Sequence, residues 1–100
     1  MVKLGLVQTT AYSSNQNGIS KISEILKKLG KQETEIVCLP EQWLKNNEIK
    51  NFDLEFSDFK KIAKEFSMTI IPGAFYDVSK TKTSIIAPII GSDGEIIGKQ

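Results

Sequence analysis

The spacing of hydrophobic residues in 2–40 changes from that of a strand to that of a helix and back again. This pattern restricts the possible folds more than any other feature of the sequence. Residues 2–7 form a short apolar run with some β-branched side chains, and a continuous run from Ile36 to Leu39 ends at Pro40. Strand, helix and strand in this order predict parallel strands joined by a right-handed crossover. The apolar residues of the intervening helix recur at spacings of three and four: Ile19, Ile22, Ile25, Leu26 and Leu29.

Both predicted helices have capping candidates at their ends. Asn17 or Ser20 can cap the start of the first helix, and Gly30 lies where a left-handed C-terminal cap belongs. A second amphipathic helix follows Ser57 and Asp58, which are its own capping candidates. Its apolar residues again keep helical spacing: Phe59, Ile62, Ala63 and Phe66.

The remaining segments predict one excursion and several strands. Residues 44–57 are rich in Asn, Lys and Glu and indicate an irregular surface excursion with room for a short helix. Residues 69–76 read as a strand with a break at Pro72-Gly73, and another strand covers 83–90. A hairpin turn over 92–95 leads into the last strand. The expected fold class is α/β, with one mixed sheet and two main amphipathic helices.

Two helices can cover only one face of such a sheet. The strands at 36–39 and 85–90 are apolar on both sides, so a further layer is expected over the second face. A partner subunit or additional sequence could supply that layer. Residues 1–100 are therefore expected to form one partial domain.

Composition excludes several classes of function. Thirteen lysines balance twelve acidic residues, and without arginine no nucleic-acid partner is expected. The absence of histidine removes imidazole bases and ligands, and a lone Cys38 cannot form a metal cluster, so no metal or cofactor is expected. An apolar strand also disfavours the Cys38 thiolate, which favours core packing over catalysis. We expect no membrane span and a cytoplasmic protein, since no apolar run is long enough and no signal peptide is present.

Glu41 is the strongest candidate for chemistry. It stands just past the carboxyl end of the predicted strand at 36–39, the edge where open α/β sheets place active sites. Pro40 fixes the local backbone, and partial burial beside Trp43 would suit the carboxylate to act as a general base. Alternatively, Glu41 belongs to the first turn of a following helix. Trp43 itself is expected to be an apolar anchor rather than a pocket wall.

Three stretches resemble the N-terminal part of the nitrilase superfamily, the carbon-nitrogen hydrolases. Residues 3–8 resemble its first strand, residues 36–41 the strand that delivers its first catalytic glutamate, and residues 92–99 the hairpin before its catalytic lysine. They occur in order over essentially the whole chain. The resemblance implies a four-layer α-β-β-α sandwich, which would provide the missing layer.

The resemblance also implies a Glu-Lys-Cys triad that hydrolyses a small amide or nitrile substrate without a cofactor. The glutamate is the general base, the cysteine forms a thioester, and the lysine stabilises the tetrahedral intermediate. Only Glu41 corresponds to a triad member here, because Lys99 neighbours the family's lysine and Cys38 does not match its nucleophile. We therefore expect an amidase-type hydrolase whose first 100 residues are inactive alone.

The alternative is a non-catalytic α/β module that acts by pairing. It would be a split half that docks on a complementary C-terminal half, or a chain that forms a homo-oligomer through its uncovered apolar face.

Overall fold

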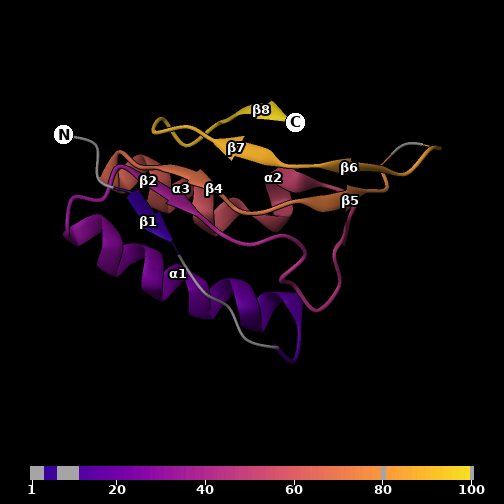
Figure 1. Cartoon of the computed structure of the whole chain (residues 1–100), viewed down its shortest axis with the longest axis horizontal. Coiled ribbons are helices and arrows are strands. Elements are labelled where there is room, and N and C mark those ends of the chain that lie inside the picture. Colours follow the sequence, from indigo (N-terminus) through magenta and orange to yellow (C-terminus); the bar gives the residue numbers. More distant parts are fainter. Residues whose placement is uncertain (1–3, 7–11, 80, 100) are drawn as a thin grey trace.

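A computed structural model describes residues 4–6, 12–79 and 81–99 of the chain (Figure 1). Helices and strands alternate at first, and strands dominate the C-terminal part. In chain order the elements are β1 (Leu4–Leu6), α1 (Asn15–Lys31), β2 (Ile36–Cys38), β3 (Glu48–Ile49), α2 (Phe52–Glu55), α3 (Ser57–Phe66), β4 (Thr69–Ile71), β5 (Phe75–Asp77), β6 (Ser84–Ile86), β7 (Pro88–Ile90) and β8 (Ile96–Lys99).

The strands form two sheets rather than the single sheet predicted. Five strands are ordered β1-β2-β4-β7-β8, and three are ordered β3-β5-β6. In the larger sheet β1, β2 and β4 are parallel, while β4, β7 and β8 pair antiparallel, as predicted for a mixed sheet. Each predicted long strand is divided between the two sheets, at Pro72-Gly73 and at Ala87-Pro88. A proline lacks the N–H that would continue a ladder, so the chain leaves one sheet for the other there.

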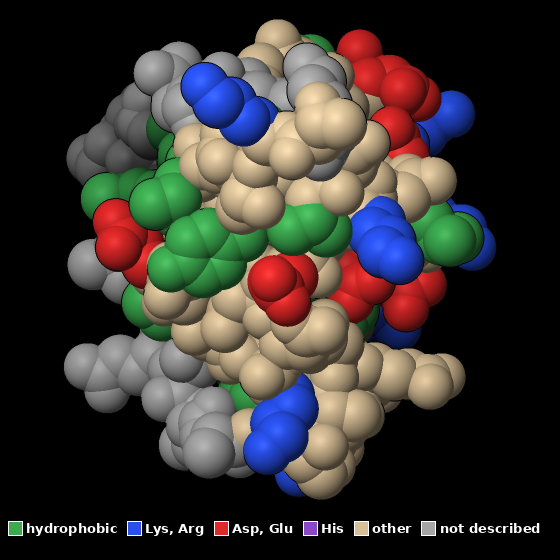
Figure 2. All heavy atoms as spheres, turned by 90° about the vertical axis from the view of Figure 1, so that its right-hand side faces the viewer, with side chains coloured by type: hydrophobic (Ala, Val, Ile, Leu, Met, Phe, Trp, Pro, Cys, Tyr) green, Lys and Arg blue, Asp and Glu red, His purple; other side chains and the backbone are tan. Residues whose placement is uncertain are grey.

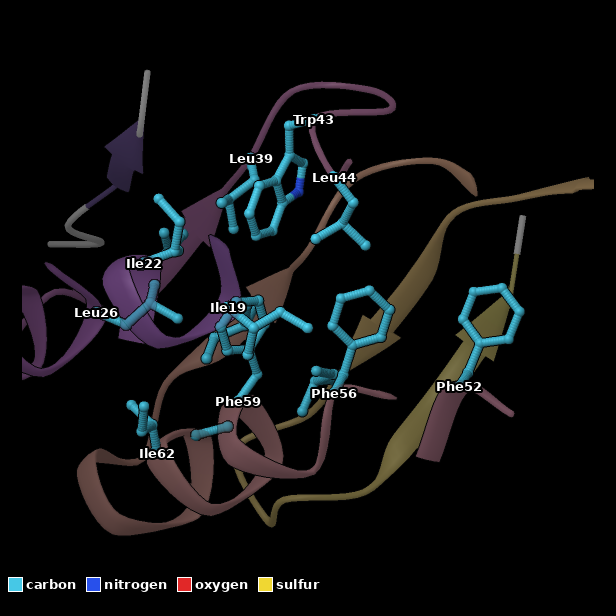
Figure 3. Close-up of a cluster of buried hydrophobic side chains, with 14 of the residues drawn as sticks. Ile19, Ile22, Leu26, Leu39, Trp43, Leu44, Phe52, Phe56, Phe59 and Ile62 are labelled. Carbon is cyan, nitrogen blue, oxygen red and sulfur yellow. The ribbon is translucent and has the colours of Figure 1, made fainter. Parts of the chain in front are cut away.

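The core lies between the larger sheet and two helices. Val37 pairs with Ile70, and Ile70 with Ile90, so these fully buried side chains form a row across β2, β4 and β7. The apolar sides of α1 and α3 pack against this row (Figure 3). The α/β fold class and the two main amphipathic helices are thus confirmed.

The opposite face of the larger sheet is apolar and carries no helix among the described elements. Strand register places on it one strongly exposed residue, Leu4, at 61% exposure, and several half-buried ones. The half-buried residues are Ile36, Cys38, Thr69, Ile71 and Ile89, of which only Thr69 is polar. This is the uncovered face that the sequence predicts.

The ends of α1 differ from the prediction. The helix begins at Asn15, and the side chain of Ser14 caps it by accepting a hydrogen bond from the backbone N–H of Asn17 at 3.0 Å. Gly30 lies inside the helix and not in a left-handed cap. A Cβ atom there would lie 2.4 Å from Cγ of Phe66, so this glycine lets α1 approach α3 closely.

None of the helices in the described part combines the length and apolar character that a bilayer crossing requires.

Lys60 of α3 joins three elements. Its Nζ atom lies 2.7 Å from Asp53 of α2 and 4.0 Å from Glu95 in the turn before β8. The hydrogen bond to Asp53 is the main cause that raises the pKa of Lys60 above its ordinary value. The same turn contacts the α3 backbone, where a Cβ on Gly94 would lie 2.9 Å from the Lys60 carbonyl oxygen. Lys60 therefore links α3 to α2 and to the turn before β8.

Candidate functional site

Glu41 lies in a turn at one edge of the larger sheet. Strands β2 and β4 are parallel, so both end at this edge, and the N–H of Leu39 donates to the carbonyl of Ile71 at 2.9 Å just beyond them. The Glu41 side chain is exposed and makes no hydrogen bond or ion pair with the described residues. The predicted partial burial beside Trp43 is wrong, because Trp43 turns into the core and Glu41 toward solvent.

The backbone of this turn is held by two further hydrogen bonds to the segment after β4. The N–H of Gln42 donates to the carbonyl of Ala74 at 3.0 Å, and the indole Nε1–H of Trp43 donates to the carbonyl of Pro72 at 2.6 Å. Gln42 has a φ of 49°, in the left-handed region that non-glycine residues rarely adopt. Such a conformation persists only where surrounding contacts enforce it.

Gly73 makes the close approach of the two segments feasible. Its φ is +123°, and a Cβ atom there would lie 2.5 Å from the carbonyl oxygen of Pro40. A side chain at this position would therefore push directly on the residue before Glu41. The break at Pro72-Gly73 thus shapes the turn as well as dividing the strand.

Trp43 is a buried anchor, as predicted, with 6% of its surface exposed. Its ring meets the ring of Tyr12 edge-on at 6.0 Å between centroids and stacks on Phe59 at 6.2 Å. Figure 3 shows the indole pointing into the core beside Leu39 and Leu44. Rings in these arrangements stabilise one another beyond the area they bury.

The chain after Trp43 is also fixed, although the sequence predicts an irregular excursion. The Asn15 side chain accepts from the Asn46 N–H at 2.8 Å and donates to the Asn46 carbonyl at 2.7 Å and to Glu55 at 2.9 Å. The Asn47 side chain bonds both backbone groups of Leu44. Sequence reasoning missed these residues, although clustered asparagines signal side-chain-capped turns.

The chain does not bring the other candidate residues to Glu41. Cys38 is a free, half-buried cysteine on the open face of β2. Lys99 ends β8, and β4 and β7 lie between that strand and β2. Three surface depressions of about 330, 280 and 610 Å³ are lined by the outer helices and the turn before β8, away from Glu41. The candidate site is therefore an exposed carboxylate on a rigid turn.

The face at the β5 and β6 end of the molecule mixes acidic, basic and apolar side chains (Figure 2). No single sign of charge gathers there. This agrees with the net charge of +1. A basic footprint, as nucleic-acid binding requires, is absent from this face of the described residues.

No protein-family model matches the chain, and no curated protein matches it. Solved structures do. A carbon-nitrogen hydrolase from Helicobacter pylori G27 superposes with a TM-score of 0.78 at 19% identity, over 99% of this chain and 38% of that one. Nit3 of Saccharomyces cerevisiae, a member of branch 10 of the nitrilase superfamily, gives 0.81 at 21% identity, over 99% and 43%.

The NitN amidase from Nesterenkonia sp. AN1 gives a TM-score of 0.79 at 15% identity, over 100% of this chain and 43% of that one. A mutant of this amidase with acrylamide added at its active site cysteine also matches, at 0.78. The chain thus spans about two fifths of the length of the solved structures it matches. It has the fold found in that part of nitrilase-superfamily structures, as the resemblance predicts, and the coverage agrees with an N-terminal portion.

Proposed function

We propose that this chain, with its nitrilase-superfamily fold, is the N-terminal part of a hydrolase of small amides or nitriles in which Glu41 is the general base. The observation that supports this most is the turn of Glu41. It presents an accessible carboxylate at the carboxyl ends of two parallel strands, where α/β folds place catalytic groups. Matching structures include an amidase with a reactive active site cysteine.

In the proposed reaction Glu41 accepts the proton of a cysteine thiol. The thiolate attacks the amide carbon, Glu41 gives the thiol proton to the nitrogen as the C–N bond breaks, and the amine leaves, which yields a thioester. Water then attacks the thioester with Glu41 again as base, which releases the acid and the thiol. The cysteine, and the lysine that stabilises the tetrahedral intermediate, would come from outside residues 1–100.

The proposal gives the open face of the larger sheet a role. In the α-β-β-α arrangement a second sheet packs on it and covers Leu4, Ile36 and Ile71. A homo-oligomer would extend this arrangement. If the chain is instead a pairing module, the same face would bind a complementary half or a second copy, without turnover.

Release of ammonia from small aliphatic amides by the natural protein that carries this chain tests the proposal. Glu41→Gln should lower kcat at least 100-fold, because glutamine keeps the shape and loses the basicity. The free energy of unfolding should be unchanged, because the Glu41 side chain is exposed and has no partner among the described residues. Glu65→Gln, at another exposed glutamate, is the matched control. Full activity of the Glu41 variant would exclude the assigned role, whereas an inactive wild type would favour the pairing module.

A further inference from the structure

Among the described residues, only the backbone sets the direction of the Glu41 side chain. Within the described residues no group holds its carboxylate, so the aim of the base depends on where the turn places its Cα–Cβ bond. A carboxylate that is displaced by about 1 Å can lose about 100-fold in rate. Groups that fix the turn therefore influence the reaction without contact with substrate.

We propose that Trp43 is a positioning residue for Glu41, an inference that rests on the proposed function. Its ring is held from two sides by Tyr12 and Phe59, so its Cα atom, two residues after Glu41, is fixed to the core. The indole N–H then ties the turn to the Pro72 carbonyl at 2.6 Å. Trp43 thus connects the turn to Phe59 of α3, to Tyr12 just before α1 and to the segment after β4.

The hydrogen bond to Pro72 ties the turn of Glu41 to the segment after β4. It is buried, so no water replaces the indole N–H when that donor is removed, and an unpaired buried carbonyl is unfavourable. The Pro72 carbonyl directly precedes Gly73, whose position limits how close Pro40 can come. A shift of Pro72 therefore moves both Pro40 and Ala74, the latter being the acceptor for the Gln42 N–H.

Trp43→Phe tests the inference, because phenylalanine keeps an aromatic ring and removes the donor. Ile62→Val is the matched control: it removes buried volume from α3 at the far side of the core cluster in Figure 3. Gly73→Ala is a second variant that displaces Pro40 from the other side of the turn. The hydrogen-exchange rate of the Gln42 amide, divided by the rate of the Ile70 amide in the centre of the sheet, gives an exchange ratio. Division by the Ile70 rate removes the effect of global stability, so this ratio reports on the turn.

The exchange ratio should rise about 10-fold in Trp43→Phe and in Gly73→Ala, and stay unchanged in Ile62→Val. In the active natural protein both variants should lower kcat about 10- to 100-fold with KM within about 2-fold. An unchanged exchange ratio would overturn the inference, as would an unchanged kcat in a variant whose turn has loosened. An inactive wild type would refute the proposed function and with it the catalytic role of the turn, whereas an unchanged exchange ratio in an active enzyme would refute only the role of Trp43.

Discussion

Replacement of Gly30 by alanine tests how α1 and α3 are held together. A Cβ atom on Gly30 would lie 2.4 Å from Cγ of Phe66 and 2.8 Å from its Cβ and Cδ2 atoms. Cβ contacts below 3.0 Å essentially never occur, so the helices have to move apart. These atoms lie close to the Phe66 backbone, and rotation of the ring about the Cβ–Cγ bond leaves Cβ and Cγ in place.

Two opposing terms set the magnitude. Alanine is more favourable than glycine inside a helix by about 0.8 to 1 kcal/mol. Overpacking of a filled core costs about 1 to 3 kcal/mol. The overpacking term should win, because no flexible side-chain end can give way at this contact. We expect Gly30→Ala to lower the free energy of unfolding by about 1 kcal/mol, equivalent to roughly 4 to 8 °C in Tm.

Urea unfolding followed by fluorescence of the single tryptophan, Trp43, and by circular dichroism measures this change. In a Phe66→Ala background the same substitution should become neutral or stabilising, because the ring has gone. Gly98→Ala is the matched control, since its Cβ would lie at an ordinary 3.7 Å from Ile89. An increase in stability for Gly30→Ala with Phe66 present would refute the close-contact explanation.

Three further substitutions probe single interactions. Because the pKa of Lys60 is raised, its pairing with Asp53 stabilises the fold fully below pH 10.5, and this stabilisation is lost as pH rises through the higher pKa of the folded state. From pH 9 to 12 the Tm should therefore fall more steeply in wild type than in Lys60→Gln. Equal slopes would contradict this. Ser23→Ala should raise stability by up to about 1 kcal/mol in urea, since its buried Oγ has no hydrogen-bond partner among the described residues; a decrease would reveal a partner. Asn15→Ala should cost about 1 kcal/mol and speed exchange of the Asn46 amide, whereas unchanged exchange would argue that this loop is held by other contacts.

Local pattern was sufficient for the helices and for the placement of Glu41. The apolar residues of α1 and α3 recur with the helical period of 3.6 because they face the sheet. A continuous apolar run such as 36–39 indicates a strand that other parts of the protein cover. The carboxyl end of that run places Glu41 at the edge of the sheet.

Other features depend on contacts between distant parts of the chain. The sequence shows a break at Pro72-Gly73, but which sheet receives the next strand depends on pairing of β5 with β3 and β6. The burial of Trp43 was predictable, but its hydrogen-bond partner, the carbonyl of Pro72, is 29 residues away in sequence and no periodicity reveals it. A glycine at position 30 suits a helix cap and a close contact between helices equally well. Only the position of Phe66 shows that the contact is the reason here.

The row Val37–Ile70–Ile90 has a consequence for synthesis on the ribosome. Val37 is made 33 residues before its buried neighbour Ile70 in β4, and 53 residues before Ile90 in β7. At about 5 to 20 residues per second, the nascent β1-α1-β2 unit waits roughly 3 to 10 seconds before its core partners exist. Until Ile70 and Ile90 have been made, the apolar side of that unit lacks the side chains that cover it in the finished fold.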